Sequence, residues 1–333
     1  MTEIVSARDV FADERFAFIP SLVRYPKLYN MYNDQIRQFW TIAVLKPSSD
    51  IPDWEALKEP EQTFIKNILG FFAGSDKIVM DNLRESFMPD IKLLEAQLFW
   101  GAQMMIEAIH SETYGLIIDI IIKNMDEKRR LGDAIQQIPA VRSKALWAQQ
   151  WSEKKDNGEF KHSLEERLIA YIIVEGLFFS GSFCAVFWLK NRGIMLNGLC
   201  KSNDLISKDE GLHTKFTTEL YNMLPSNLRL PQSRIYEIFD DALAIETDFI
   251  CQSLKCDLIG MNKELMKSYL QFTADKLISS LGYNTKFGIK SNPCKFADML
   301  GMASKENSFE TTSINYQMAG VGKRNEFRLD ADV

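Results

Sequence analysis

Apolar residues recur along most of the chain three or four positions apart, which is the spacing of one face of an α-helix. Between residues 61 and 87 this pattern is continuous, and Pro89 interrupts it. The same reasoning predicts helices over residues 28–44, 61–87, 91–122, 127–152 with a break near Pro139, 163–190, 203–222, 232–256 and 262–281. Gly282 then stands where a helix commonly ends. The pattern predicts an all-α protein built from long helices.

One of these helices is apolar nearly throughout. The stretch from Leu168 to Leu189 contains a single charged residue, Glu175, and is long enough to cross a bilayer. Basic residues flank it at both ends, and a helix that is apolar all round equally suits the centre of a large bundle. We expect a buried core helix and no membrane. A carboxylate there must be paired, protonated or bound to a metal, which makes Glu175 a functional candidate.

Composition narrows the class of protein further. The 333 residues include 39 Lys and Arg against 45 Asp and Glu, a net charge of −6 without a basic block, which argues against nucleic-acid binding. Turn formers are few, with 17 Gly and 10 Pro, as long helices require. The five cysteines are odd in number and scattered, and the residues near Met1 lack the pattern of a signal peptide. These features favour a cytoplasmic location.

Three segments of different character follow one another along the chain. Residues 1–50 are broken by Pro20, Pro26 and Pro47 and are expected to form an N-terminal arm with one short helix. Residues 51–302 carry the long helical patterns. Residues 303–333 are polar and aperiodic, so a flexible tail is expected there. The sequence has no glycine-rich phosphate-binding motif.

Each of the three histidines has a glutamate three residues before it. The pairs are Glu107 with His110, Glu159 with His162, and Glu210 with His213. Residues at this spacing share a face only within a helix. His162 fails that test because it follows a polar turn and precedes the N-cap residue Ser163, so we expect it in a solvated loop. The other two pairs lie within predicted helices.

Each helical pair is preceded by a helix that carries its own carboxylate. Asp76 lies 31 residues before Glu107, and Glu175 lies 35 residues before Glu210. A carboxylate helix followed by a Glu-x-x-His helix, repeated once, is the ligand set of a dinuclear metal site in a four-helix bundle. Four carboxylates and two imidazoles favour iron or manganese over zinc. The predicted ligands are Asp76, Glu107, His110, Glu175, Glu210 and His213.

An aromatic group is expected beside this site. Tyr114 follows His110 by four residues on the same helix face, so its phenol should lie near the metals. Phe179 and Phe183 follow Glu175 by four and eight residues and would shield that phenol from water. Ordinary core packing explains all three rings equally well. Beside a redox-active metal pair, however, one-electron oxidation of the phenol becomes chemically reasonable.

Three segments together resemble one known family. Residues 105–114 (MIEAIHSETY), 174–183 (VEGLFFSGSF) and 206–213 (ISKDEGLH) look like signature blocks of the small, radical-generating subunit of class I ribonucleotide reductase, of the eukaryotic and large-DNA-virus type. The likeness runs from about Tyr25 to Val333. It implies a ferritin-like helical bundle with a four-helix di-metal core and additional flanking helices.

The resemblance also implies roles for particular residues. The six predicted ligands would bind two iron ions, with manganese not excluded, and O2 would be needed to form a stable radical at Tyr114. Radical transfer would involve Trp40, Asp209 and Tyr316. The radical pocket would comprise Phe179, Phe183 and Ile206. Docking on the large subunit would use the tail residues Phe327, Leu329, Asp330, Asp332 and Val333. Val333 departs from the family's aromatic or leucine terminus, which would retune that docking.

Three functions are consistent with these features, and one of them, a related Mn/Fe protein or oxygenase on the same bundle, would need neither Tyr316 nor the docking tail. The resemblance implies the small subunit of ribonucleoside-diphosphate reductase, a homodimer that works with a large subunit, which itself holds the ribonucleotide. The other alternative is a ferritin-like iron-binding or iron-storage protein, which explains the metal ligands but gives no role to the tail. Metal content separates the small subunit from iron storage, because the small subunit predicts two metal ions per chain and iron storage predicts many.

Overall fold

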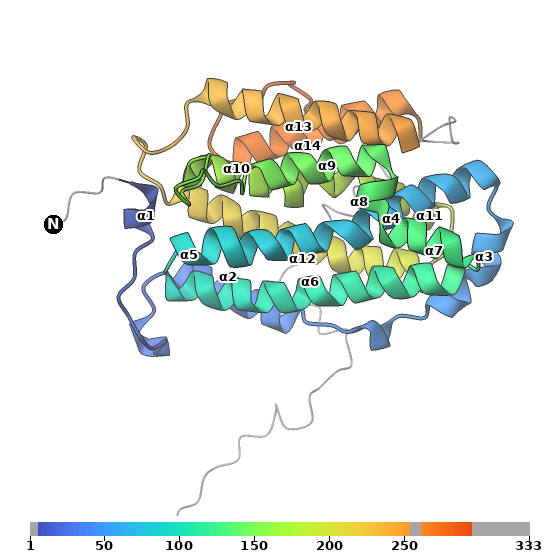
Figure 1. Cartoon of the computed structure of the whole chain (residues 1–333), viewed down its shortest axis with the longest axis horizontal. Coiled ribbons are helices and arrows are strands. Elements are labelled where there is room, and N and C mark those ends of the chain that lie inside the picture. Colours follow the sequence, from blue (N-terminus) through green and yellow to red (C-terminus); the bar gives the residue numbers. More distant parts are fainter. Residues whose placement is uncertain (1–5, 254–260, 295–333) are drawn as a thin grey trace, which may run out of the picture.

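Long helices lie side by side along the longest axis of the protein (Figure 1). The computed structural model describes residues 6–253 and 261–294. Four helical segments form the central bundle: α4 (Glu59–Asn82), α6 (Leu94–Ile121), α12 (Leu199–Asn222), and the segment from Leu164 to Asn191. Within this bundle α4 packs against α6, α6 packs against α12, and α11 packs against both α12 and α4. The predicted all-α, ferritin-like bundle is confirmed.

The segment from Leu164 to Asn191 is the apolar helix that the sequence singled out. It consists of α10 (Leu164–Ile173), the π-helical turn η5 (Val174–Phe178) and α11 (Ser180–Asn191). Ser163 caps it as predicted, with its hydroxyl accepting from the Glu166 N–H. The most apolar window of this segment is 94% buried within the protein. Its hydrophobicity is therefore explained by its central place in the bundle.

Further helices cover the bundle. α2 (Pro26–Arg37) lies on α6, and α9 (Pro139–Gln150) lies on α4. α13 (Gln232–Ser253) packs on α9 and on α14 (Lys263–Ser280), which in turn contacts α11. The shorter elements are α1 (Ala7–Val10), η1 (Pro20–Leu22), η2 (Ile42–Val44), η3 (Pro47–Asp50), α3 (Ile51–Ala56), η4 (Leu83–Phe87), α5 (Met88–Asp90), α7 (Met125–Gly132) and α8 (Ala134–Gln137).

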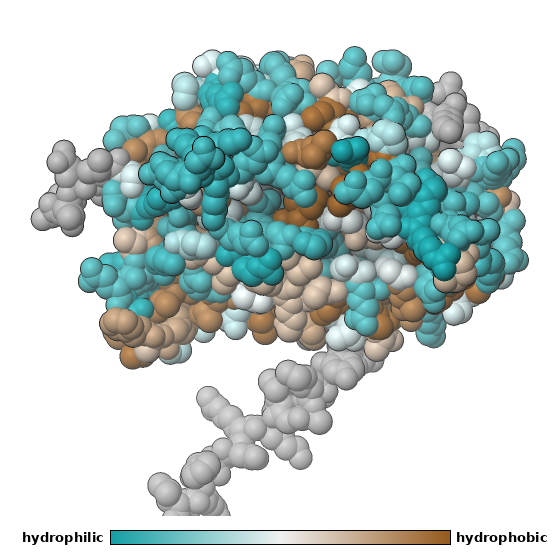
Figure 2. Space-filling model, in the orientation of Figure 1, coloured by the Kyte–Doolittle hydropathy of each residue, from teal (hydrophilic) through white to brown (hydrophobic). Residues whose placement is uncertain are grey.

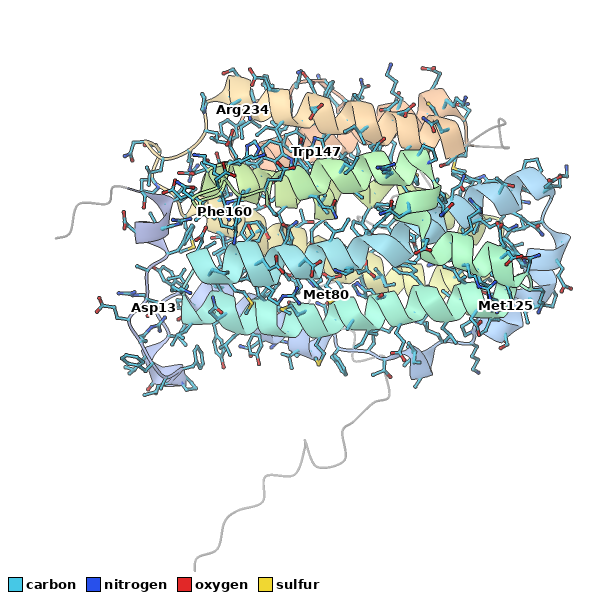
Figure 3. All side chains as sticks on the ribbon, viewed as in Figure 1. Asp13, Met80, Met125, Trp147, Phe160 and Arg234 are labelled. Carbon is cyan, nitrogen blue, oxygen red and sulfur yellow. The ribbon has the colours of Figure 1, made fainter. Side chains whose placement is uncertain are left out.

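Polar contacts attach the outer layer to the bundle. Figure 3 labels Trp147 and Arg234 at this layer. The indole of Trp147 on α9 donates to Asp241 of α13 at 2.7 Å. Arg234 of α13 pairs with Glu166 of α10 at 2.8 Å. These contacts join α13 to both the outer helix α9 and the central segment.

The long helices lie where the sequence pattern predicts them, but several begin or end at residues other than the predicted ones. The helix predicted over 28–44 ends at Arg37, so Trp40 lies in a non-helical stretch. The helix predicted from 203 begins at Leu199. Two π-helical turns, η4 and η5, were not predicted, because a single wide turn leaves no periodicity in the sequence. The division of the chain at residue 303 lies outside the described residues.

The turn between α11 and α12 is held by the N-terminal arm. The carboxylate of Asp50 accepts from the N–H groups of Asn197, Gly198 and Leu199 at 2.8–3.1 Å, which satisfies the first turn of α12. A Cβ at Gly198 would lie 2.5 Å from the backbone of Pro47, so only glycine allows this close approach. With these contacts to the arm, α12 begins at Leu199, four residues before the start predicted from the sequence.

Candidate metal centre and tyrosine site

The six predicted metal ligands come from all four segments of the central bundle. Asp76 lies on α4, Glu107 and His110 on α6, Glu175 on the π-turn η5, and Glu210 and His213 on α12. All six side chains are buried. Because Glu and His at i and i+3 share a helix face, α6 and α12 each present two donors to the same interior point.

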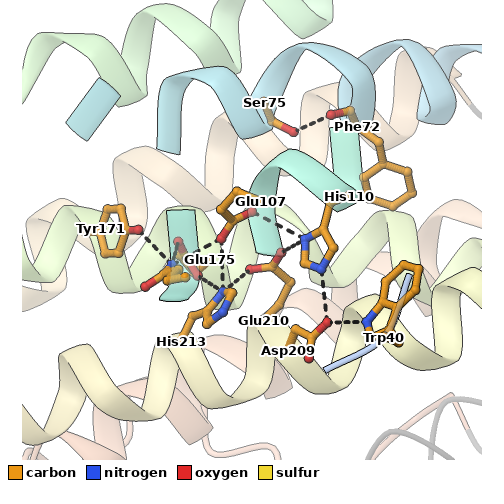
Figure 4. Close-up of polar contacts among 11 residues, drawn as sticks. Trp40, Phe72, Ser75, Glu107, His110, Tyr171, Glu175, Asp209, Glu210 and His213 are labelled. Carbon is orange, nitrogen blue, oxygen red and sulfur yellow. Dashed lines mark hydrogen bonds and ion pairs between the residues drawn. The ribbon is translucent and has the colours of Figure 1, made fainter. Parts of the chain in front are cut away.

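The two histidines face the same carboxylates from opposite ends of the cluster (Figure 4). Nδ1 of His110 lies 3.3 Å from Glu107 Oε2 and 3.1 Å from Glu210 Oε1. Nδ1 of His213 lies 3.0 Å from Glu107 Oε1 and 3.3 Å from Glu210 Oε2. Glu107 and Glu210 therefore each present one oxygen to each imidazole, as carboxylates do when they bridge two cations. Glu175 Oε2 lies 3.3 Å from His213 Nδ1, which places it at one end.

Asp76 is the sixth predicted ligand, and its nearby charges include Glu107, His110, Glu210 and Glu175. It lies outside the tightest group, in which the donor atoms of Glu107, Glu175, Glu210 and His213 are all within 4.8 Å of one another. Both oxygens of Asp76 are buried without a hydrogen-bond partner in the described part of the chain. Burial, reinforced by the charge of Glu107, holds the pKa of Asp76 well above its usual range, while His110 opposes this shift.

This cluster fits a pair of metal ions. Buried polar atoms normally form hydrogen bonds, yet each of the six ligands has at least one atom without a hydrogen bond among the described residues: both oxygens of Asp76, Glu107 Oε2, His110 Nδ1, Glu175 Oε2, Glu210 Oε1 and His213 Nε2. Burial and the neighbouring carboxylate of Glu210 raise the pKa of Glu175. Bound cations would satisfy the carboxylate oxygens and His110 Nδ1, and they would remove the mutual repulsion of the carboxylates.

A hydrogen-bonded chain leads from His110 toward the N-terminal arm. Nε2 of His110 lies 3.0 Å from Asp209 Oδ2, and the Trp40 indole N–H donates to the same oxygen at 2.8 Å. The rings of Trp40 and His110 are stacked at 5.9 Å. A proton on Nε2 directed at Asp209 leaves Nδ1 free for a cation, which fixes the tautomer a metal ligand needs. The structure thus brings together Trp40 and Asp209, two of the three residues that the family resemblance assigned to radical transfer, with the predicted metal ligand His110.

Gln103 and Tyr171 belong to this site, although sequence reasoning missed them. The Gln103 amide nitrogen lies 3.1 Å from Glu107 Oε1, 3.1 Å from Glu175 Oε1 and 3.0 Å from the Tyr171 hydroxyl. Gln103 precedes Glu107 by four residues, and Tyr171 precedes Glu175 by four. That spacing was the available signal, because it puts a polar group on the ligand-bearing face of an apolar helix.

Tyr114 is buried, and its hydroxyl has no hydrogen-bond partner in the described part of the chain. Burial and the nearby carboxylate of Asp76 raise the pKa of this phenol well above its usual value. Its ring stacks on Phe72 at 4.5 Å, a contact that sequence reasoning missed. The predicted pocket residues Phe179 and Phe183 pack against Phe72 at 5.9 and 5.4 Å. Ile206, the third pocket residue, is fully buried on α12.

His162 is not part of this cluster. His162 lies in the loop before α10, as predicted, and is partly exposed, with its ring tilted against that of Trp151 at 4.4 Å and its Nδ1 3.4 Å from Glu166. Tyr316 and the docking residues Phe327, Leu329, Asp330, Asp332 and Val333 lie outside the described residues.

Comparison with known proteins identifies the family. The model of the family "Ribonucleotide reductase, small chain" matches residues 19–293. The ribonucleoside-diphosphate reductase small chain of Trypanosoma brucei brucei is 45% identical over 323 residues, covering 96% of this chain and 93% of that protein. The small chain of Vaccinia virus (strain Ankara) is 44% identical over 321 residues, covering 96% and 97%.

Solved structures agree with this assignment. The ribonucleotide reductase Rnr4 homodimer from Saccharomyces cerevisiae has a TM-score of 0.76 at 27% identity, covering 88% of this chain and 90% of that one. The dimanganese(II)-NrdF of Streptococcus sanguinis has the same fold, with a TM-score of 0.76 at 16% identity, covering 86% of this chain and 99% of that one. An iron-storage protein would have the buried cluster but would not explain the match to this family. The chain belongs to the ribonucleotide reductase small-chain family and is the small subunit of an oxidoreductase.

Proposed function

We propose that this small subunit binds two iron ions, reacts with O2 and stores a radical at Tyr114 for use by a large subunit. The observation that carries the proposal is a buried cluster of carboxylates and imidazoles next to a buried phenol without a hydrogen-bond partner among the described residues. When bound, two iron ions would supply the reaction with O2 and the one-electron oxidising power.

The chain's own residues would divide this task among them. Asp76 and His110 would hold one ion, Glu175 and His213 the other, and Glu107 and Glu210 would lie between the two. These hard oxygen and nitrogen donors suit iron and manganese alike. We propose iron as the resident metal, and metal analysis of the purified protein tests that choice against manganese.

Tyr114 would carry the radical because its surroundings protect it. Its raised pKa keeps the phenol protonated, so loss of an electron must be accompanied by loss of the hydroxyl proton. Phe72 covers one face of its ring, and Phe179 and Phe183 pack behind Phe72, which excludes water and small reductants. A radical in such a setting is long-lived because little can reach it.

The chain Trp40–Asp209–His110 would connect this site with the large subunit. Its two short contacts and stacked rings supply an uninterrupted route from the cluster to the N-terminal arm. Tyr316 would continue the route, and residues 327–333 would dock on the large subunit, which would bind and reduce the ribonucleotide. Truncation of residues 327–333 should abolish nucleotide reduction with the large subunit while sparing the radical. Retained reduction would contradict the docking role.

A second copy of the chain is the proposed partner at an apolar surface. Apolar residues gather along the lower edge of Figure 2, below α6 in the matching view of Figure 1. Large exposed hydrophobic residues concentrate on the arm, on α2 and on α6: Phe16, Ile19, Leu22, Ile36, Phe39, Val44 and Met105. Contiguous exposed apolar surface commonly marks an interface. Met105→Lys should shift the protein toward monomer in light scattering, whereas Leu146→Lys, an exposed apolar residue on α9, should not.

The cytoplasm is the proposed location. Cys184, Cys200, Cys251 and Cys294 carry free thiols, as a reducing compartment maintains.

Loading with ferrous iron and oxygen tests the proposal as a whole. The protein should take up two irons per chain and develop a tyrosyl radical signal by electron paramagnetic resonance. Uptake of many irons per chain, as iron storage requires, or two irons without a radical would contradict it.

A further inference from the structure

Lys144 is a buried cation away from the metal cluster. Its side chain is 1% exposed, and Nζ lies 2.6 Å from Oε2 of Glu246, which is fully buried. Nζ also donates to the backbone carbonyl of Phe178 at 2.7 Å. Lys144 lies on α9 and Glu246 on α13, whereas Phe178 ends the π-turn η5. One ammonium group therefore ties two outer helices to the turn that carries Glu175.

Aromatic rings enclose the ammonium group. Nζ lies 3.3 Å from the ring centre of Phe71, 4.2 Å from that of Phe249 and 5.3 Å from that of Phe178. Ring faces attract cations, most strongly where water is excluded. Phe71 in turn contacts Phe179 at 5.3 Å and Phe72 at 5.8 Å, and Phe72 is the ring that stacks on Tyr114. The ion pair is thus packed into the outer side of the tyrosine pocket.

Gly181 leaves the space that Glu246 occupies. A Cβ at Gly181 would lie 2.6 Å from Glu246 Oε1 and 3.1 Å from Ile250. Any larger residue would push the carboxylate from its place. Position 181 therefore needs glycine because Glu246 occupies the space of a side chain, and not because the backbone there requires one.

A buried ion pair is weak evidence for a role in stability, since hydrophobic replacements of similar volume are often as stable. Its better-attested use is to select one arrangement among several. A π-turn is such an arrangement, because the same residues in α-helical register would rotate Glu175 away from its present direction. Lys144 reaches the carbonyl at the end of that turn.

We propose that Lys144 and Glu246 act as a positioning pair, which holds the π-turn Val174–Phe178 in the register that directs Glu175 into the metal cluster. The consequence for metal binding rests on the proposed function, whereas the effect on the turn itself does not. A second buried cation provides a parallel: Arg167, 2% exposed, donates to the Ser86 carbonyl in the other π-turn, η4, at 3.1 Å.

Hydrogen–deuterium exchange of the metal-free full chain tests the pair. In Lys144→Met/Glu246→Leu, which removes both charges, amides of residues 174–183 should exchange about tenfold faster, while those of α6 and α12 keep wild-type rates. Arg167→Met is the matched control and should loosen residues 83–87 but not 174–183. Gly181→Ala keeps both charges but displaces Glu246, so it should also speed exchange at residues 174–183. This variant replaces the double variant in the test if the double variant does not fold.

Metal affinity provides the second readout. In the double variant the affinity for Mn²⁺ should fall by about tenfold to a hundredfold, as it does when groups supporting a ligand are lost. Wild-type exchange at residues 174–183 in folded variants, or faster exchange spread evenly over the central bundle, would overturn the proposal. Failure of the wild-type protein to bind Mn²⁺ would instead refute the metal site and leave the exchange result to decide the role of the pair.

Discussion

Replacing Asp76 should change the stability of the metal-free and metal-loaded protein in opposite directions. Without metal, this buried carboxyl has no hydrogen-bond partner among the described residues, and burial and Glu107 raise its pKa. An unsatisfied buried polar group costs about 1–3 kcal/mol, and more if charged. The raised pKa means that folding at neutral pH must either bury this charge or take up a proton, and both cost free energy. Asp76→Asn keeps the volume and cannot ionise, so the metal-free variant should be more stable by about 1–3 kcal/mol.

Metal should reverse this order. Binding to the native state adds about 4.1 kcal/mol when free metal exceeds Kd a thousandfold, and the variant should lose most of this increment, which is larger than its gain without metal. Urea unfolding followed by circular dichroism, with chelator and then with Mn²⁺, measures both states. Asp119→Asn, an exposed position on the same helix α6 as Glu107, is the control and should change neither value by more than about 0.5 kcal/mol. A metal-free Asp76→Asn protein less stable than wild type, or one that gains as much from Mn²⁺, would refute the reasoning.

Three further predictions concern the supports of the site. Gly176→Ala would place a Cβ 2.9 Å from Leu277, so urea unfolding should show a loss of about 1–3 kcal/mol; an unchanged value would contradict this packing. Asp209→Ala should weaken metal binding by about tenfold to a hundredfold, measured by Mn²⁺ titration, because His110 loses the acceptor that fixes its tautomer. Burial raises the pKa of Glu246 from 4.5 to about 7 and lowers that of Lys144 from 10.5 to about 8. Relative to Lys144→Met/Glu246→Leu, the wild type should lose about 3 kcal/mol as pH rises from 4.5 to 7 and regain a similar amount from 8 to 10.5, so a pH-independent difference would contradict these shifts.

The buried cluster of carboxylates and histidines could be predicted because its signal is local. Glu107 and His110 share a helix face by spacing alone, and an isolated charge such as Glu175 in an apolar helix needs a partner. The helices themselves follow from periodicity over many residues. These two kinds of pattern are sufficient for the bundle and for the ligands that it brings together.

The contacts missed by sequence reasoning depend on tertiary packing. Trp40 and Asp209 are 169 residues apart, and only a family resemblance associated them before the structure did. Lys144 resembles any surface lysine in the sequence, yet it is buried against Glu246. The π-turn at Glu175 adds one wide turn, which does not disturb an all-apolar pattern. Stacking of Phe72 on Tyr114 likewise depends on how α4 meets α6.

The central claim is that Tyr114 carries the radical, and the most direct test is the electron paramagnetic resonance spectrum after aerobic iron loading. The spectrum is compared between variants of two buried tyrosines, Tyr114 and Tyr171. Tyr114 stacks on Phe72, whereas Tyr171 lies beside Gln103 and Glu175. The account predicts that Tyr114→Phe binds two irons per chain but shows no tyrosyl signal, and that Tyr171→Phe retains the wild-type signal. A full tyrosyl signal in Tyr114→Phe, or its loss only in Tyr171→Phe, would contradict the account.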